Sequence, residues 1–183
     1  MFSYLLLLFF AGAVLISILA YVVFALDSLI RGQDLPTSDR AIENIGRIIS
    51  EFKKENGKFY DLGCARGKLA VRLKTKFPDL EVWAIDKSLV RLFFARIRAL
   101  FWKRKINFLR NDIFRLDLSQ ADVVYAYLWW DLLPMLEKKL QEELRPGSLI
   151  ICNTSHLLSW KLKEVRITHP EQPDFEKLFV YIK

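Results

Sequence analysis

The sequence predicts an α/β protein with a doubly wound, mostly parallel sheet, an antiparallel hairpin at its carboxyl end and one membrane-spanning helix at its amino terminus. Strand-like runs alternate with helical patterns between residues 58 and 152, an order that is typical of parallel sheets. The run 122–128 is almost continuously apolar, as in a strand that is buried on both faces. The first 26 residues contain no charged side chain.

The amino-terminal segment has the length of a membrane span. Residues 5–26 are apolar except for Ser17, and at about 1.5 Å per residue they can cross a hydrocarbon core of roughly 30 Å. A cleaved signal peptide is the alternative, but no basic residue precedes the run, the run exceeds the usual length of about 7 to 15 residues, and no convincing A-x-A cleavage site follows. We therefore expect a retained anchor over residues 1–30.

The remaining residues, 31–183, are enough for one domain with a single hydrophobic core. All Lys and Arg residues follow the apolar segment, beginning with Arg31, so the positive-inside rule predicts a single-pass protein whose domain lies on the cytoplasmic, or matrix-equivalent, side. The net charge of the whole chain is +7, and Asp27 is its only charged side chain before residue 31, so the positive charge lies in the domain and favours anionic lipid headgroups as a partner. Nucleic acid is the other common partner of basic proteins, but no zinc-finger spacing, recognition helix or RNA-binding aromatic motif is present, so we expect none.

Cysteine and histidine are scarce. Cys64 and Cys152 fall in or beside predicted strands, which suits a reducing compartment rather than a disulfide framework. His156 and His169 do not lie at a metal-ligand spacing with the cysteines. We therefore expect neither a bound metal nor a histidine-based nucleophile.

The first half of the domain is predicted to contain two helices and two strands. Ser38 or Asp39 can cap a helix that Asn56-Gly57 ends. The apolar positions of this helix recur at helical spacing: Ala41, Ile42, Ile45, Ile48, Ile49 and Phe52. The chain then forms, in order, a strand at 58–62, a helix at 68–76 that Pro78 stops, and a strand at 81–85.

The next predicted helix, 88–102, is both apolar and strongly basic, and no acid lies between Asp86 and Asp112. The cations in and beside it are Lys87, Arg91, Arg96, Arg98, Lys103, Arg104 and Lys105. One interpretation leaves these cations in water and assigns five residues to the core: Leu89, Leu92, Phe93, Ile97 and Leu100. The other lays the basic face of the helix on a membrane, with about 1 kcal/mol of attraction per cation.

Strands at 106–109, 122–128 and 148–152 and a helix at 132–144 complete the alternating part, with Arg145-Pro146-Gly147 as a turn before the last strand. The tail departs from this order. Its two strand-like segments, 161–168 and 175–182, are separated by a loop with two prolines rather than by a helix. We expect them to pair as an antiparallel hairpin at one edge of the sheet.

The most informative motif is the loop after the first predicted strand, Asp61-Leu62-Gly63-Cys64-Ala65-Arg66-Gly67. Its two glycines permit backbone conformations closed to other residues and close approach of a ligand, which the free N–H groups of the following helix would face. Asp86 ends the second strand, where a carboxylate pairs with ribose hydroxyls in dinucleotide-type sites. The alternative is an ordinary strand-to-helix turn, in which Asp61 or Cys64 caps the helix and Asp86 opens the next one.

Together with Leu144-Arg145-Pro146-Gly147-Ser148-Leu149-Ile150 before the fifth strand, these features resemble the class I S-adenosylmethionine-dependent methyltransferases. The resemblance implies a Rossmann-like fold and S-adenosyl-L-methionine as the cofactor. The anchor, Pro36-Thr37, Asn111-Asp112-Ile113 and Leu136-Glu137-Lys138-Lys139-Leu140 are similar, more narrowly, to the small membrane-anchored protein-lysine methyltransferases whose animal members modify the ATP synthase c-subunit and the adenine nucleotide translocase.

The resemblance implies eight cofactor-binding residues: Thr37, Asp61, Gly63, Cys64, Gly67, Asp86, Asp112 and Ile113. By this resemblance, the glycine loop shapes the site for the methionine part, Asp86 accepts both ribose hydroxyls, Asp112 and Ile113 hold the adenine, and Thr37 lies near the carboxylate. Ala65 stands where a glycine is usual, so its Cβ is expected to crowd the cofactor.

Aromatic residues follow the fourth predicted strand at the carboxyl edge of the sheet, where ligands bind in such folds. Our candidate catalytic residues are Tyr127, Trp129 and Asp131: the two aromatic rings would steer a lysine amine by cation–π attraction, and Asp131 would accept its proton or orient it. Methyl transfer itself requires alignment rather than a nucleophilic side chain. The alternative is that Trp129 and Trp130 only cover the sheet edge or contact lipid.

The sequence therefore predicts a membrane-anchored methyltransferase that acts on a lysine of a membrane-associated protein. Two alternatives stay open. One is methylation of a lipid or quinone-like small molecule. The other is a noncatalytic membrane-docking module that retained the fold but lost cofactor binding, a hypothesis that rests on Ala65 and on Arg66, which is unusual in such a loop.

Overall fold

The computed structural model describes residues 2–31 and 35–183. These residues form two compact units, which divide between Asp34 and Leu35. The predicted boundary between the anchor and the domain lies between residues 30 and 31. Residues 32–34, just after it, lie outside the part of the chain that the structure describes.

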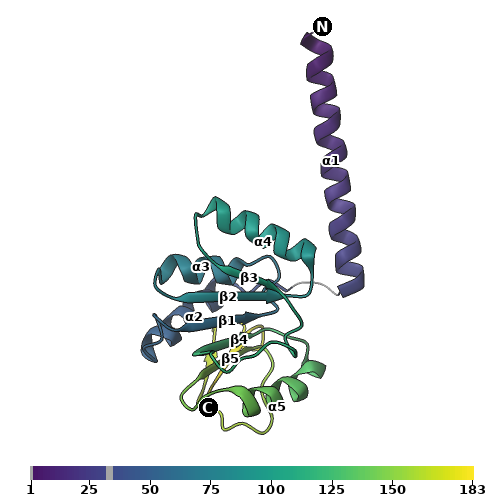
Figure 1. Cartoon of the computed structure of the whole chain (residues 1–183). Coiled ribbons are helices and arrows are strands. Elements are labelled where there is room, and N and C mark those ends of the chain that lie inside the picture. Colours follow the sequence, from purple (N-terminus) through teal and green to yellow (C-terminus); the bar gives the residue numbers. More distant parts are fainter. Residues whose placement is uncertain (1, 32–34) are drawn as a thin grey trace. The chain divides into compact units, whose positions relative to one another are not determined.

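The first unit is a single helix, α1 (Phe2–Arg31; Figure 1). Its segment Tyr4–Leu29 has the length and the apolar composition of a membrane span, two criteria that a signal sequence also meets. The hydroxyl of Ser17 donates a hydrogen bond to the carbonyl oxygen of Ala13 at 2.8 Å. The helix thus satisfies this polar group internally, as a lipid environment requires.

The second unit is built on a seven-stranded sheet in the order β3-β2-β1-β4-β5-β7-β6 (Figure 1). The strands are β1 (Lys58–Leu62), β2 (Glu81–Asp86), β3 (Asn107–Arg110), β4 (Val123–Ala126), β5 (Leu149–Asn153), β6 (Glu164–Ile167) and β7 (Lys177–Ile182). Strands β1 to β5 are parallel, and β7 pairs antiparallel with both β5 and β6. The strand order reverses between β1 and β4, so their carboxyl ends form the switch point at which ligands bind in doubly wound sheets. The predicted fold is confirmed.

Helices lie on both faces of the sheet. On one face, α2 (Asp39–Glu51), α3 (Lys68–Lys76) and α4 (Leu89–Phe101) share a hydrophobic cluster with the strands. On the other face, α5 (Leu133–Glu143) packs with residues that follow β3 and β5. Successive strand residues point to opposite faces, so Phe59 joins the first cluster and Tyr60 the second.

Several predicted boundaries are wrong, and β6 begins at Glu164 rather than at residue 161. Helix α2 ends at Glu51 rather than at Asn56-Gly57, because Lys53 takes the left-handed conformation (φ 55°) that terminates a helix. Strand β4 ends at Ala126 rather than at residue 128, because its ladders to β1 and β5 both end there. The chain from Tyr127 onward therefore leaves the sheet and leads into a short 3₁₀ helix, η1 (Trp130–Leu132).

The packing of α4 contradicts one of its two interpretations. Only one of the five residues assigned to the core, Leu92, is buried, and the other four are exposed: Leu89, Phe93, Ile97 and Leu100. The helix packs through Leu92, Ala95 and Ala99 instead. The small side chain of Ala95 allows a close approach to the start of α3, since a Cβ placed on Gly67 would lie 2.9 Å from the Cβ of Ala95.

We expect Gly67→Ala to lower the free energy of unfolding by about 2–5 kcal/mol, because it combines a left-handed conformation (φ 67°) with a clash against Ala95. Gly147→Ala is the matched control and should cost about 1–2 kcal/mol, since Gly147 also has a positive φ (85°) but a Cβ placed on it would meet no atom within 4 Å. Denaturant unfolding of the full chain measures both values. Equal losses would mean that the contact between α3 and α4 is not tight.

Candidate cofactor and acceptor site

The loop between β1 and α3 contains three residues with positive φ: Gly63 (82°), Ala65 (46°) and Gly67 (67°). The N–H groups of Gly63 and Cys64 donate to the carbonyl oxygen of Ile85 in β2, at 2.9 and 2.8 Å. Gly67 occupies the N-cap of α3. The interpretation in which Asp61 or Cys64 caps this helix is therefore wrong, and the helix starts without a capping side chain.

Asp86, at the end of β2, connects this loop to α4. One carboxylate oxygen accepts the N–H of Ala65 at 3.0 Å, and the other accepts the N–H of Ser88 at 2.8 Å. The interpretation in which Asp86 opens the next helix is wrong, because Ser88 is the N-cap of α4 and accepts the N–H of Arg91. Asp86 instead holds the glycine loop and the backbone of that N-cap residue. The carboxylate lies at the carboxyl end of β2, where ribose hydroxyls bind in folds of this kind.

Asp61 is buried in β1, and its Oδ2 atom has no hydrogen-bond partner among the described residues. Burial, together with the charge of Asp86, raises the pKa of this carboxyl group to about 8. A buried carboxyl oxygen without a partner, next to a second acid, is suited to bind a cation. The same surroundings raise the pKa of the Cys64 thiol well above its ordinary value, so the thiol stays protonated and is a poor nucleophile.

Asp112 follows the end of β3, and two contacts fix the position of its side chain. It accepts the N–H of Phe114 at 3.0 Å and pairs with Lys87 at 3.1 Å. Burial alone would raise the pKa of Asp112, but these two contacts outweigh it and the pKa is lowered. Ile113, the next residue, is buried in the second cluster. Because β2 and β3 are parallel neighbours, Asp86 and these two residues lie at the same edge of the sheet.

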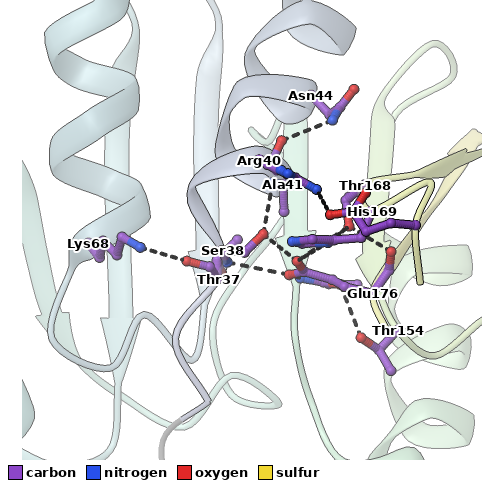
Figure 2. Close-up of polar contacts among 12 residues, drawn as sticks. Thr37, Ser38, Arg40, Ala41, Asn44, Lys68, Thr154, Thr168, His169 and Glu176 are labelled. Atoms are coloured by element: carbon purple, nitrogen blue, oxygen red, sulfur yellow. Dashed lines mark hydrogen bonds and ion pairs between the residues drawn. The ribbon is translucent and has the colours of Figure 1, made fainter. Parts of the chain in front are cut away.

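Thr37 belongs to a buried hydrogen-bond network, part of which Figure 2 shows. Its hydroxyl shares a hydrogen bond of 2.8 Å with the hydroxyl of Tyr125 in β4. The side chain of Asn153, at the end of β5, donates to Tyr125 at 3.0 Å and to Glu176 at 2.7 Å. Lys68, the first residue of α3, donates to the carbonyl oxygen of Thr37 at 3.1 Å, which ties the network to the glycine loop.

Glu176 is the main acceptor of this network (Figure 2). It lies just before β7, is buried, and accepts hydrogen bonds from the Ser38 hydroxyl and from Asn153. The hydroxyl of Thr168 donates to its main-chain oxygen at 2.7 Å, and the ring of His169 lies 3.9 Å from its carboxylate. The carboxylate therefore joins the segment before α2, the end of β5 and the loop between β6 and β7.

We expect Glu176→Gln to destabilise the domain by about 1–3 kcal/mol. The Glu176 carboxylate accepts hydrogen bonds from Ser38 and Asn153, whereas the amide nitrogen of a glutamine would place N–H donors against one of these donors. Since Ser38 adjoins Thr37, we also expect about a tenfold loss of cofactor affinity, equal to about 1.4 kcal/mol. Glu171→Gln, which alters an exposed ion pair with Arg40, is the control and should change either value little. Thermal unfolding and calorimetric titration measure the two effects. Reduced stability with unchanged affinity would show that the network does not position Thr37 for the cofactor.

Tyr127, Trp129 and Asp131 lie on the segment between β4 and α5, next to the glycine loop. A Cβ placed on Gly63 would lie 3.1 Å from the Cδ2 atom of Leu128, which shows how closely the two loops approach. Tyr127 is partly buried against the first cluster, whereas Trp129 and Asp131 are exposed. The segment that carries the three candidate residues thus approaches the glycine loop at Leu128.

Three polar residues of this edge were not selected from the sequence: Tyr125, Asn153 and Glu176. Asn153 and Glu176 lie next to or near the ends of predicted strands, which is a signal for the edge of the sheet but not for the hydrogen bond between them. Glu176 precedes β7, and because β7 runs antiparallel to its neighbour β5, its start lies at the edge where the parallel strands end. Burial raises the pKa of the Tyr125 hydroxyl well above its ordinary value, which keeps it neutral within the network.

A mostly parallel seven-stranded sheet, a glycine loop after β1 and a carboxylate at the end of β2 define the protein as a class I S-adenosylmethionine-dependent methyltransferase. Comparison with known proteins agrees with this class. The chain belongs to the family described as the ANTKMT methyltransferase domain, whose model matches residues 61–164, more than half of the chain.

Individual relatives support the same class. The chain is 24% identical over 133 residues to a protein-lysine N-methyltransferase of Saccharolobus islandicus (strain REY15A), a match that covers 72% of this chain and 81% of the relative. It is 31% identical over 90 residues to a carboxy-S-adenosyl-L-methionine synthase of Campylobacter hominis, but this match covers 49% of the chain and only 38% of that protein. An RNA methyltransferase from Salinibacter ruber, solved in complex with S-adenosyl-L-homocysteine, has a TM-score of 0.71 at 20% identity, over 81% of this chain and 93% of that one, which shows a shared fold.

The residues at this edge fit S-adenosyl-L-methionine, the cofactor of this enzyme class. The cofactor carries an ammonium and a sulfonium group, and Asp61 offers a buried carboxyl oxygen that lacks a partner among the described residues. It also carries two ribose hydroxyls, and Asp86 offers a carboxylate at the strand end where such hydroxyls bind. Ala65 adopts its left-handed conformation in the loop and its N–H is held by Asp86, so the missing glycine does not prevent the loop from forming.

Proposed function

We propose that this protein transfers a methyl group from S-adenosyl-L-methionine to a lysine side chain of a membrane-associated protein. The observation that carries the enzyme activity is the buried Asp61 carboxyl group beside Asp86 at the switch point of the sheet, which forms a site for a cationic nucleoside. The family match and the lysine methyltransferase among the relatives support a lysine acceptor. The cofactor-binding roles of Thr37, Gly63, Cys64, Gly67, Asp112 and Ile113 are part of this proposal.

The cofactor, when bound, supplies a methyl group on a positively charged sulfur, which is a strong electrophile. The residues of this chain bind the cofactor and the acceptor amine and align the two for reaction. Asp61 holds the positive groups, Asp86 holds the ribose, and Tyr127 and Trp129 steer the acceptor amine by cation–π attraction. Asp131 accepts the proton that a lysine ammonium must lose before it can attack. Alignment of the two reactants can contribute roughly 7–11 kcal/mol.

The amino-terminal helix is proposed to remain attached as a membrane anchor. Its apolar segment has the length of a span. The Lys and Arg residues that follow it favour, by the positive-inside rule, a domain on the cytoplasmic, or matrix-equivalent, side. An anchored enzyme meets membrane-bound acceptors at a raised effective concentration. The exposed position of Trp129 and Asp131 suits an acceptor that is part of a larger protein.

Incubation of the full chain with its native membranes and an isotopically labelled methyl donor tests this function. We expect label in the protein fraction, on lysine, and its loss in Asp86→Ala. Asp131→Asn should slow transfer while cofactor affinity stays unchanged, because Asp131 is assigned to the acceptor. Label in the lipid extract instead would identify a lipid or quinone-like acceptor. No transfer and no cofactor binding would favour a noncatalytic docking module.

A further inference from the structure

Helix α4 carries an exposed apolar stripe on the side away from the sheet. It packs against β2, β3 and α3 (Figure 1). Successive residues of a helix are rotated by about 100°, so the exposed apolar side chains of α4 project within an arc of about 120°, opposite to its buried residues. The α4 stripe consists of Leu89, Phe93, Ile97, Leu100 and Phe101. Leu100 and Phe101 are 78% and 82% exposed. Single exposed apolar residues are common, but a continuous stripe of five marks an interaction surface.

Cations border this stripe on both sides. In the same helical projection, Arg96 lies along one border, and Arg91 and Arg98 lie along the other. Lys103 and Lys105 extend the positive charge beyond the end of the helix, and the sequence from Lys87 to residue 111 contains no acid. An apolar strip flanked by cations is the pattern of a helix that lies in the plane of a membrane surface.

We propose that α4 docks on an anionic lipid bilayer, with its stripe among the acyl chains and its cations at the headgroups. Charge complementarity selects this occupant, because anionic headgroups match the cations beside the stripe and a purely apolar protein groove does not. Only residues 32–34 connect α1 to the domain. A bilayer that holds α1 therefore keeps the domain within reach of its surface.

Docking through α4 has a consequence for the site. The helix begins at Leu89, and its N-cap Ser88 is hydrogen-bonded to Asp86. A docked α4 therefore fixes the ribose-binding end of the site close to the bilayer surface. This membrane contact does not depend on methyl transfer. An experiment that disproves the docking would therefore leave the proposed function unaffected, and the reverse also holds.

An environment-sensitive fluorophore on the full chain, reconstituted in vesicles, tests the docking. Ile97→Cys places the label on the stripe, and Gln120→Cys places it on an exposed loop of the opposite face. The native thiols, Cys64 and Cys152, are buried, so background labelling is low, and the unmutated chain measures it. We expect a blue shift at position 97, and quenching by spin-labelled lipid, in vesicles that contain phosphatidylglycerol. Position 120 should show neither effect.

Charge reversal tests the contribution of the cations. The double variant Arg98→Glu and Lys103→Glu should lower the ratio of docked to undocked protein at least about 30-fold in anionic vesicles. Each cation near such a surface raises this ratio about fivefold, so the loss of two cations alone accounts for that factor. The pair Lys161→Glu and Lys163→Glu changes the net charge equally on exposed residues outside α4, and it should have little effect. High salt should weaken the preference for anionic vesicles, because the Debye length falls to about 3 Å at 1 M.

Two results would overturn the proposal. A label at position 97 that reports water in every vesicle, with the same emission as at position 120, would show that the stripe stays in solvent. A label that is shielded equally in neutral and anionic vesicles, and more strongly at higher protein density, would show that a second copy of the chain covers the stripe.

Discussion

Asp61→Asn should abolish cofactor binding while it stabilises the cofactor-free domain above neutral pH. The asparagine keeps the shape of the side chain but lacks the negative charge that meets the ammonium and sulfonium groups. Removal of a buried charge that pairs with a bound cation weakens the free energy of binding by about 3–5 kcal/mol, which lowers cofactor affinity at least about 100-fold. A variant that gains stability and loses binding cannot be explained by misfolding, so the two effects together identify a binding residue.

The stabilisation follows from the raised pKa of Asp61. The ordinary pKa of this group is 3.8, and in the folded domain it is about 8. Between these values the unfolded chain has lost the proton that the folded chain keeps, so stability is highest below about pH 4 and falls by up to about 1.4 kcal/mol per pH unit as the pH rises to about 8. Asp61→Asn removes this slope and should raise the free energy of unfolding at pH 8 by about 2–4 kcal/mol, less than the full amount because the buried amide lacks partners.

Asp117→Asn provides the control for Asp61→Asn. Asp117 is an exposed aspartate that accepts hydrogen bonds from Ser119, and its pKa is lowered by them. Its variant should leave cofactor affinity and the alkaline part of the stability profile unchanged. An Asp61→Asn protein that binds S-adenosyl-L-methionine as tightly as the wild type would remove Asp61 from the site.

Asp86→Ala should weaken cofactor binding at least about 100-fold and also destabilise the domain. Its carboxylate accepts the N–H groups of Ala65 and Ser88, and each buried donor left without an acceptor costs about 1–3 kcal/mol. We therefore expect a loss of about 2–4 kcal/mol in the free energy of unfolding. Calorimetric titration and denaturant unfolding of the same sample measure the two effects.

Asp86→Asn separates binding from folding. Its side-chain oxygen can still accept one of the two N–H groups, so about half of the stability loss should be recovered. Affinity should stay at least about tenfold below that of the wild type, because the charged acceptor of the ribose hydroxyls is lost. Recovery of full affinity together with stability would show that Asp86 only supports the loop.

The order of elements was predictable from the sequence because each element carries its own local signal. The alternation of apolar strands with capped helices predicts the parallel sheet, and the loop with two prolines predicts the final hairpin. Element ends were less predictable. Lys53 ends α2 by adopting a left-handed conformation that lysine rarely takes, and β4 ends where its pairing with β1 and β5 ends rather than where its apolar residues do.

The sequence singled out the candidate cofactor residues but not the polar residues around them. Asp61 and Asp86 follow from the glycine loop and from the position of an acid at a strand end. The network of Tyr125, Asn153 and Glu176 joins residues that are far apart in the chain, so no local pattern reveals it. The exposed stripe of α4 was also missed, because small residues such as Ala95 do its packing and periodicity alone assigns the large apolar residues to the core.

We propose that a cationic nucleoside binds at the end of β1 against the Asp61 carboxyl group, which is protonated when the site is free. Calorimetric titration of the full chain with S-adenosyl-L-methionine at pH 7, in two buffers of different ionisation enthalpy, measures the protons released on binding. We predict release of close to one proton by the wild type, because a group with a pKa of about 8 is ionised by the incoming cation. Tight binding without proton release, or equal binding by Asp61→Asn, would contradict the claim.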